Sequence, residues 1–286
     1  MKNNTKFTIV ECPRDAMQGI KKFIPTKTKA SYINSLTKVG YDIIDFGSFV
    51  SPKAMPQMKD TAEVLKLLNL NHNTRLLAIV LNLKGASEAL RHDEISILGY
   101  PLSISEIFQK NNSGKSISNS LNIIDKINNL CIKKNKNLLV YLSMAFGNPY
   151  GEYWNSELVF YYIDLLKAKS INMISLADTI GIASTQSISD IYSSLFTMTN
   201  IDFGLHLHTS SNTASDKINA AWNAGCRRFD VTINGLGGCP FAQDTLTGNV
   251  PTESFLNFLS KKNINHNLDL LAFEAAYNQA KEIFTV

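Results

Sequence analysis

The sequence lacks several features that would assign it to a broad class of protein. No apolar run approaches about 18 residues, the length that a membrane-spanning helix needs, and no apolar stretch follows the first residues as in a signal peptide. The four cysteines, Cys12, Cys131, Cys226 and Cys239, include no CxxC pair, which argues against a disulfide framework. We therefore expect no membrane contact and a cytoplasmic location, where thiols stay reduced.

Charge and glycine patterning exclude two further classes. The formal net charge is only +4, and the basic residues are spread along the chain, so no nucleic-acid surface is predicted. The G-x-G-x-x-G fingerprint of dinucleotide-binding sheets is absent after the first apolar run. Hydrophobic residues make up 44% of the 286 residues, which is enough for the core of a single domain spanning 1–286.

Short β-rich apolar runs alternate with longer amphipathic stretches. The runs are Phe7–Cys12, Asp42–Phe46, Arg75–Leu81, Glu94–Leu98, Leu138–Met144, Met173–Leu176, Phe203–Thr209 and Arg228–Ile233. The helical patterns cover about 26–39, 55–68, 84–91, 116–135, 155–170, 185–199, 212–225, 252–262 and 269–284. This alternation predicts an α/β fold, a closed (β/α)₈ TIM barrel, with an open doubly wound sheet as the alternative. In such a barrel the active residues lie at the C-terminal ends of the strands.

The stretch GLHLHTS holds two histidines in the seventh predicted strand. Because side chains alternate between the faces of a strand, His206 and His208 point the same way. A hydrogen-bonded structural pair is one interpretation. The other is a metal site, since His-x-His aims two nitrogens at one cation.

Further polar residues follow other predicted strands. Arg14 and Asp15 come after the first strand, where a simple loop salt bridge is the ordinary interpretation, and Asp45 and Asp178 close the second and sixth. The eighth strand leads into a glycine-rich loop with Cys239, a candidate acid or nucleophile unless it is merely a small buried thiol. Together with the imidazoles, a carboxylate and an amide oxygen would suit Mg²⁺ or Mn²⁺, and also zinc.

Several longer strings carry a family resemblance. VECPRDAMQ, IIDFGSFVSPKAMPQM, SLADTIG, HLH and GLGGCPFA occur in the order found in the 3-hydroxy-3-methylglutaryl-CoA lyase family of metal-dependent TIM-barrel lyases and Claisen synthases, which the chain resembles over about 7–284. The resemblance implies a divalent metal at the C-terminal face, Mg²⁺ or Mn²⁺, held by Asp15, His206, His208 and Asn249. At the reacting centre it implies roles for Arg14, Cys239, His206 and Asp45, and substrate contacts for Arg14, Gln18, Ser48 and Asp178.

The chain departs from the family pattern at four places. Asp45 stands where the family has a glutamate, and Thr209 replaces an acidic residue able to orient a ligating histidine. Asn148–Pro149 replaces a Cys-Pro pair, and Ala177 replaces a glycine. These departures leave the acyl substrate open.

The reaction that the resemblance implies is cleavage of 3-hydroxy-3-methylglutaryl-CoA into acetyl-CoA and acetoacetate. His206 is the first candidate for the base, Arg14 stabilises the enolate, and Cys239 or water returns a proton. The partner is an acyl-CoA thioester, and the assembly a homodimer. The alternatives are a lyase for another 3-hydroxyacyl-CoA, a synthase joining an acyl-CoA to a 2-oxo acid, and a homologue without catalysis.

Overall fold

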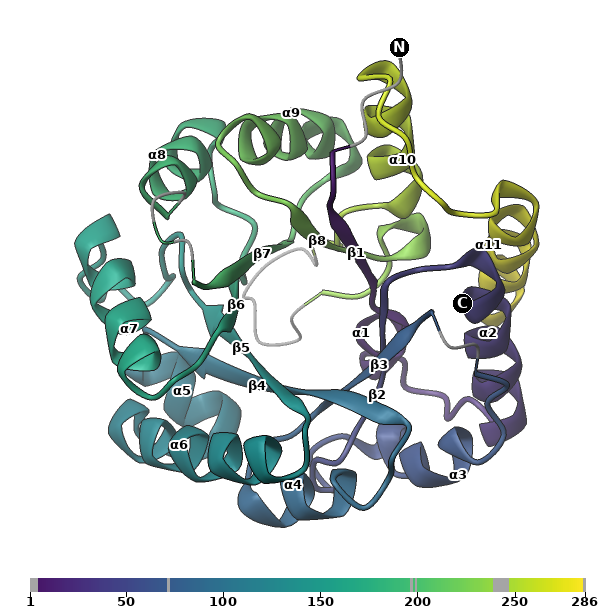
Figure 1. Cartoon of the computed structure of the whole chain (residues 1–286), viewed down its shortest axis with the longest axis horizontal. Helices are drawn as coiled ribbons and strands as arrows, with labels where there is room; N and C mark the ends of the chain where they lie inside the picture. Colours follow the sequence, from purple (N-terminus) through teal and green to yellow (C-terminus); the bar gives the residue numbers. More distant parts are fainter. Residues whose placement is uncertain (1–4, 71–72, 196–197, 199, 239–246, 285–286) are drawn as a thin grey trace.

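Eight parallel strands close into a barrel in sequence order (Figure 1). The computed structural model describes residues 5–70, 73–195, 198, 200–238 and 247–284. The strands are β1 (Thr8–Glu11), β2 (Ile43–Ser48), β3 (Arg75–Ile79), β4 (Ile95–Ser103), β5 (Asn137–Ser143), β6 (Met173–Asp178), β7 (Asp202–Leu207) and β8 (Arg228–Val231). Because β8 pairs with β1, the predicted (β/α)₈ barrel is confirmed and the open sheet is excluded.

Helices surround the barrel (Figure 1). They are α1 (Pro13–Gln18), α2 (Thr26–Val39), α3 (Thr61–Leu65), α4 (Leu83–Ala89), α5 (Glu106–Ser113), α6 (Ile117–Lys133), α7 (Ser156–Ala168), α8 (Thr185–Leu195), α9 (Ser211–Asn223), α10 (Thr252–Lys261) and α11 (Leu270–Phe284), with 3₁₀ turns at Pro56–Met58 and Ile233–Gly235. Local signals set several of the boundaries. The side chains of Ser105, Ser116 and Asn155 accept the first free backbone N–H groups of α5, α6 and α7, and α2 ends at Gly40 with a φ of 89°.

Several elements differ from the sequence expectation. The helices α1 and α5 had not been expected, and β4 runs to Ser103, well beyond the expected end at Leu98. The stretch after Leu98 contains Gly99 and Pro101, residue types that predict a turn. In the barrel it pairs with β5 residue by residue up to Ser103, so the partner strand overrides the local preference.

The barrel interior combines an apolar cluster with buried polar residues. Inward-facing Val10, Cys12, Ile43, Leu77 and Leu139 belong to one buried cluster, to which β6 to β8 contribute only Met173. Next to this cluster, on β8, the polar residues Arg228 and Asp230 are buried as well.

Arg228 fills space that its neighbour on β7 leaves open. Its guanidinium donates to the backbone carbonyls of Ile174 and Asp202 and pairs with the Asp202 carboxylate. A Cβ placed on Gly204 would lie 2.8 Å from the Cζ of Arg228 and 2.7 Å from the hydroxyl of Ser175. Glycine at 204 therefore makes room for the buried guanidinium.

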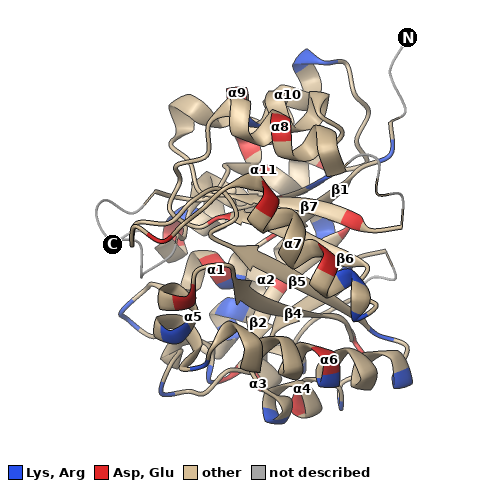
Figure 2. Ribbon diagram, turned by 90° about the vertical axis from the view of Figure 1, so that its left-hand side faces the viewer, with Lys and Arg blue, Asp and Glu red and all other residues tan. Residues whose placement is uncertain are grey.

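The outer surface shows no segregation of charge. In Figure 2, Lys and Arg side by side with Asp and Glu mark several outer helices, among them α5 and α6. Within the part of the chain that the structure describes, no helix is both long and apolar enough to cross a membrane.

Candidate active site

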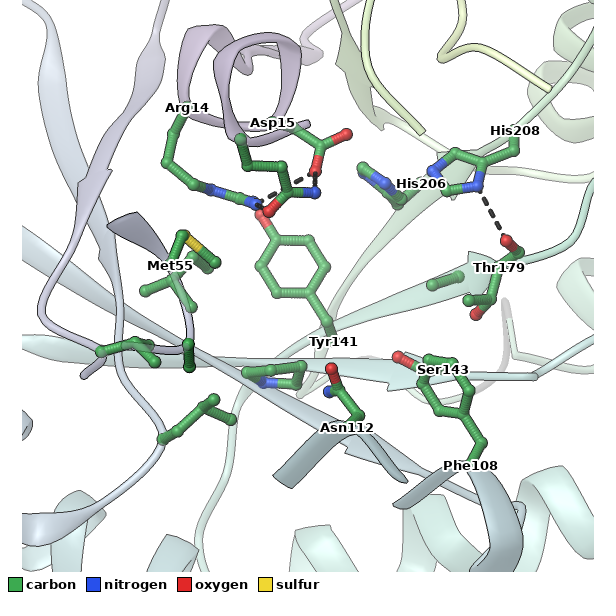
Figure 3. Close-up of a pocket in the computed structure, with 17 residues that line it drawn as sticks. Arg14, Asp15, Met55, Phe108, Asn112, Tyr141, Ser143, Thr179, His206 and His208 are labelled. Atoms are coloured by element: carbon green, nitrogen blue, oxygen red, sulfur yellow. Dashed lines mark hydrogen bonds and ion pairs between the residues drawn. The ribbon is translucent and has the colours of Figure 1, made fainter. Parts of the chain in front are cut away.

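A cavity opens among loops and strand ends on the side of the barrel where α1 follows β1 (Figure 3). Arg14, Asp15 and Gln18 line one wall, because the short helix α1 turns over the mouth directly after β1. The strand-end residues His206 and His208 lie beside them. The remaining wall is largely apolar and includes Val50, Met55, Ile79, Leu81, Pro101 and Phe108.

The four predicted metal ligands come together at this cavity. Asp15, His206 and His208 each offer one ligand atom, and these atoms lie within 4.8 Å of one another. Asn249 joins them, since its side-chain amide donates to Asp15 Oδ2 at 2.6 Å and its backbone bridges to His208. This convergence favours the metal interpretation of the His-x-His pair over an isolated structural pair.

Each imidazole is held by its Nδ1 atom. His208 Nδ1 lies 2.8 Å from the backbone oxygen of Thr179, and this contact requires a proton on Nδ1. His208 Nε2 is buried and has no hydrogen-bond partner among the described residues. Burial and neighbouring His206 lower the pKa of His208 to about 4, which keeps it neutral at pH 7. A neutral ring with an open Nε2 fits a divalent cation.

His206 is oriented by a carboxylate that the sequence analysis did not identify. Its Nδ1 lies 3.1 Å from Oδ2 of Asp230, on β8. Burial opposes the charged ring, but the hydrogen bond and charge of Asp230 outweigh burial and raise the pKa of His206 above its ordinary value. Thr209, which replaces the acidic residue of the family, bonds to Thr213 and not to a histidine. Asp230 and the Thr179 carbonyl orient the two imidazoles in its place.

Arg14 lies between two carboxylates. Its guanidinium donates to Asp45 Oδ2 from Nε at 3.0 Å and from Nη2 at 2.5 Å, and to Asp15 Oδ1 at 3.0 Å. Asp45 itself is buried behind Arg14 and is not part of the cavity wall. Burial raises the pKa of Asp45 to about 6, although Arg14 opposes the shift. Gln18 completes the group by donating to Asp15 Oδ1 at 2.6 Å.

Two residues expected at the substrate are not brought to the cavity wall. The hydroxyl of Ser48 donates to the Ile79 carbonyl, and the carboxylate of Asp178 accepts the N–H groups of Ile182 and Ala183. Both side chains therefore engage the backbone, Ser48 that of the neighbouring strand and Asp178 that of the following loop. The expected acid or nucleophile Cys239 lies outside the described residues.

Other cavity residues were not foreseen. Tyr141 of β5 has its ring centroid 5.7 Å from that of His206, and its buried hydroxyl has no hydrogen-bond partner among the described residues. Asn112 and Phe108 come from α5 (Figure 3). Side chains two residues apart on β5 lie on the same face of the strand, so Tyr141 points to the same side as Ser143. This alternation is the sequence signal that could have identified Tyr141.

The departure at 148 has a local explanation. Asn148 Oδ1 accepts the N–H groups of Tyr150 and Glu152, and Glu152 in turn accepts those of Glu106 and Ile107 at the start of α5. The loop after β5 therefore fixes a helix that lines the cavity. Ala177 lies at the cavity wall itself.

A buried glutamate anchors the segment that carries Asn249. Glu11 accepts the Ile233 N–H at 2.9 Å and the Thr252 hydroxyl at 2.7 Å, so one carboxyl group holds both ends of this segment. Burial raises the pKa of Glu11 to about 8. This contact could not be predicted from the sequence, because Glu11 is far along the chain from Ile233 and Thr252.

Comparison with known proteins agrees with this arrangement. The model of the HMGL-like family matches residues 7–279. A hydroxymethylglutaryl-CoA lyase of Bacillus subtilis is 33% identical over 269 residues, covering 93% of this chain and 89% of the relative, and the mitochondrial enzyme of Gallus gallus is 32% identical over 263 residues, covering 90% and 86%.

The solved structures show the same relationship. An HMG-CoA lyase from Acinetobacter baumannii, in complex with coenzyme A and 3-methylmalate, superposes with a TM-score of 0.90 at 29% identity, covering 97% of this chain and 91% of the other. The Bacillus subtilis structure gives a TM-score of 0.90 at 32% identity, covering 99% and 95%. Since the family model and these relatives span nearly the whole barrel, including the cavity and the four converging ligands, the chain belongs to the HMGL-like family.

Proposed function

We propose that this protein cleaves 3-hydroxy-3-methylglutaryl-CoA to acetyl-CoA and acetoacetate with the help of a divalent cation. The observation that carries the proposal is the convergence of Asp15, His206, His208 and Asn249 beside Arg14 at one cavity. The relatives at 32–33% identity are named for this reaction, and a similar structure binds coenzyme A.

The donor set suits Mg²⁺ or Mn²⁺. It offers carboxylate and amide oxygens with two imidazoles and no thiolate, a combination that hard divalent ions accept. When bound, the cation supplies a Lewis acid for the hydroxyl and carbonyl oxygens of the substrate. Asn249 presently donates to Asp15, so its amide must turn to present its oxygen.

Arg14 binds the developing enolate oxygen. Asp45 and Asp15 hold its guanidinium in place before substrate arrives, which removes the cost of organising it during the reaction. A single preorganised donor of this kind contributes on the order of 3 kcal/mol to transition-state stabilisation. Cys239 is our candidate for returning a proton to the enolate carbon.

The base that takes the hydroxyl proton is His206 or Asp45. Because Nδ1 of His206 faces Asp230, only Nε2 remains, and one nitrogen cannot ligate a cation and accept a proton at the same time. Asp45 has an oxygen, Oδ1, with no hydrogen-bond partner among the described residues, and a pKa of about 6 suited to proton transfer near neutral pH. Its shorter side chain must reach past Arg14.

The decisive experiment is a coupled assay for acetoacetate with purified protein, 3-hydroxy-3-methylglutaryl-CoA and Mg²⁺ or Mn²⁺. We expect turnover that EDTA abolishes and that either cation restores. Failure to release acetoacetate with both cations would refute the assignment. Cleavage of another 3-hydroxyacyl-CoA, or condensation of an acyl-CoA with a 2-oxo acid, would instead identify one of the neighbouring activities.

We further propose that the protein is a homodimer with a cytoplasmic location, and that residues 1–286 form a single domain.

A further inference from the structure

A second group of metal-binding side chains lies next to the first. Cys12, His206 and Asp230 each offer one ligand atom, and these atoms lie within 4.8 Å of one another. They come from the C-terminal side of β1, β7 and β8, which are consecutive around the barrel. Cys12 and Asp230 are almost completely buried, with 1% and 2% of their surface exposed.

The polar atoms of this group are incompletely satisfied. Asp230 Oδ1 is buried and has no hydrogen-bond partner among the described residues, and Oδ2 meets only the Nδ1 of His206. Cys12 makes a long contact of 3.7 Å from Sγ to the carbonyl of Val10. A buried carboxylate with open lone pairs is costly unless a donor or a cation approaches it.

The surrounding charge is negative. Burial, together with Asp230, Asp45 and Asp15, raises the pKa of the Cys12 thiol, and Arg14 alone opposes them. Without a cation the thiol therefore keeps its proton. A divalent ion reverses this balance by neutralising the carboxylates and stabilising the thiolate.

We propose that Cys12, His206 and Asp230 form a second metal site, selective for thiophilic divalent ions of the Zn²⁺ class. A thiolate with an imidazole and a carboxylate selects zinc over magnesium, whereas the neighbouring group has no thiolate. His206 is common to both sites, and its Nδ1 carries the proton donated to Asp230. Coordination through Nδ1 moves that proton to Nε2, so His206 serves one site at a time. Binding also breaks the S–H bond of Cys12, and its proton passes to solvent as the metal–sulfur bond forms.

The consequence is inhibition by zinc through His206. An ion bound between Nδ1 and Asp230 removes the hydrogen bond that orients the imidazole. This consequence rests on the proposed lyase function, but binding at the second site does not. Metal binding is therefore measured by spectroscopy, independently of lyase activity.

Co²⁺ is the probe, because a Co²⁺–thiolate bond gives an intense charge-transfer band in the near ultraviolet that oxygen and nitrogen ligands do not give. Metal-free full-length protein is titrated with Co²⁺. We expect the band to rise to saturation, and Zn²⁺ to displace it. The Cys12→Ser variant should lose the band, while Cys226→Ser, a buried thiol elsewhere, and Cys239→Ser should keep it.

Circular dichroism of each variant shows whether it folds, and Asp230→Asn provides a second perturbation that leaves every thiol intact. We expect Asp230→Asn to weaken Co²⁺ binding at least tenfold. The proposal is overturned if wild-type protein shows no such band, or if the band survives in folded Cys12→Ser. Absence of lyase activity with the band intact would refute the proposed function alone.

Discussion

Glu11 should make the protein less stable as the pH rises above 7, and Glu11→Gln should remove this contribution. The carboxyl has a pKa of about 8 in the folded chain against an ordinary value of 4.5. Because the folded state binds the proton more tightly, the stabilisation is complete below about pH 4.5 and is lost as the pH rises through about 8. Between pH 7 and pH 9 the wild-type protein should lose roughly 1.4 kcal/mol of unfolding free energy through this group.

The variant separates this effect from the loss of a hydrogen bond. A glutamine at 11 can still accept from the Ile233 N–H but presents an amide to the Thr252 hydroxyl, so it should cost about 1 kcal/mol at pH 7. That cost should shrink toward pH 9, because only the wild type loses the contribution of Glu11 there. Glu88→Gln is the matched control, since Glu88 forms an exposed ion pair with Arg91.

Urea unfolding followed by circular dichroism at pH 6, 7, 8 and 9 measures the difference. With an m-value of about 3 kcal/mol/M, this group should lower the wild-type midpoint by roughly 0.5 M between pH 7 and pH 9. The midpoint of Glu11→Gln should fall by less than that of the wild type, and that of Glu88→Gln should follow the wild type. Parallel decline of all three proteins would show that Glu11 does not hold its proton in the folded state.

The remaining predictions concern the cavity. Arg14→Met should leave Mn²⁺ affinity by calorimetry nearly unchanged but lower turnover about 100-fold or more, and turnover within a few-fold of wild type would contradict its enolate role. His208→Ala should weaken Mn²⁺ binding at least tenfold without loss of fold, and unchanged affinity would remove His208 from the ligand set. Cys239→Ser should sharply reduce turnover while sparing metal binding, and in the wild type a substrate analogue should protect Cys239 from iodoacetamide. Slow, equal labelling of all four cysteines together with a fully active serine variant would refute its role. Asp230→Asn should lower turnover and shift the acidic limb of the pH–rate profile, whereas a profile unchanged in shape would mean that Asp230 only fills space.

The sequence anticipated what strand direction determines. In a barrel of parallel strands all C-terminal ends meet at one face, so Asp15, His206 and His208 were expected together and are together. Asn249 was assigned by family resemblance alone, because nothing in its neighbourhood marks a ligand.

The direction in which side chains point at the strand ends could not be predicted from the sequence. Ser48 lies past an irregularity in β2 between Asp45 and Gly47, which changes the register with β3 and hence the alternation of faces. Asp178 accepts a hydrogen bond from a backbone N–H of the loop that follows it. The sequence does not distinguish a strand-end carboxylate that points into the cavity from one that bonds to its own loop. Asp230 was missed because it lies within the predicted strand Arg228–Ile233, whereas candidate residues were expected at the strand ends.

The interlock of Gly204 and Arg228 has an evolutionary consequence. Arg228 is tied to Asp202 and to the Ile174 carbonyl, so it cannot withdraw from a methyl group at 204. A side chain at 204 and an arginine at 228 are therefore incompatible in this barrel. The two positions should covary among homologues, and a change at 204 alone should be deleterious while arginine stands at 228.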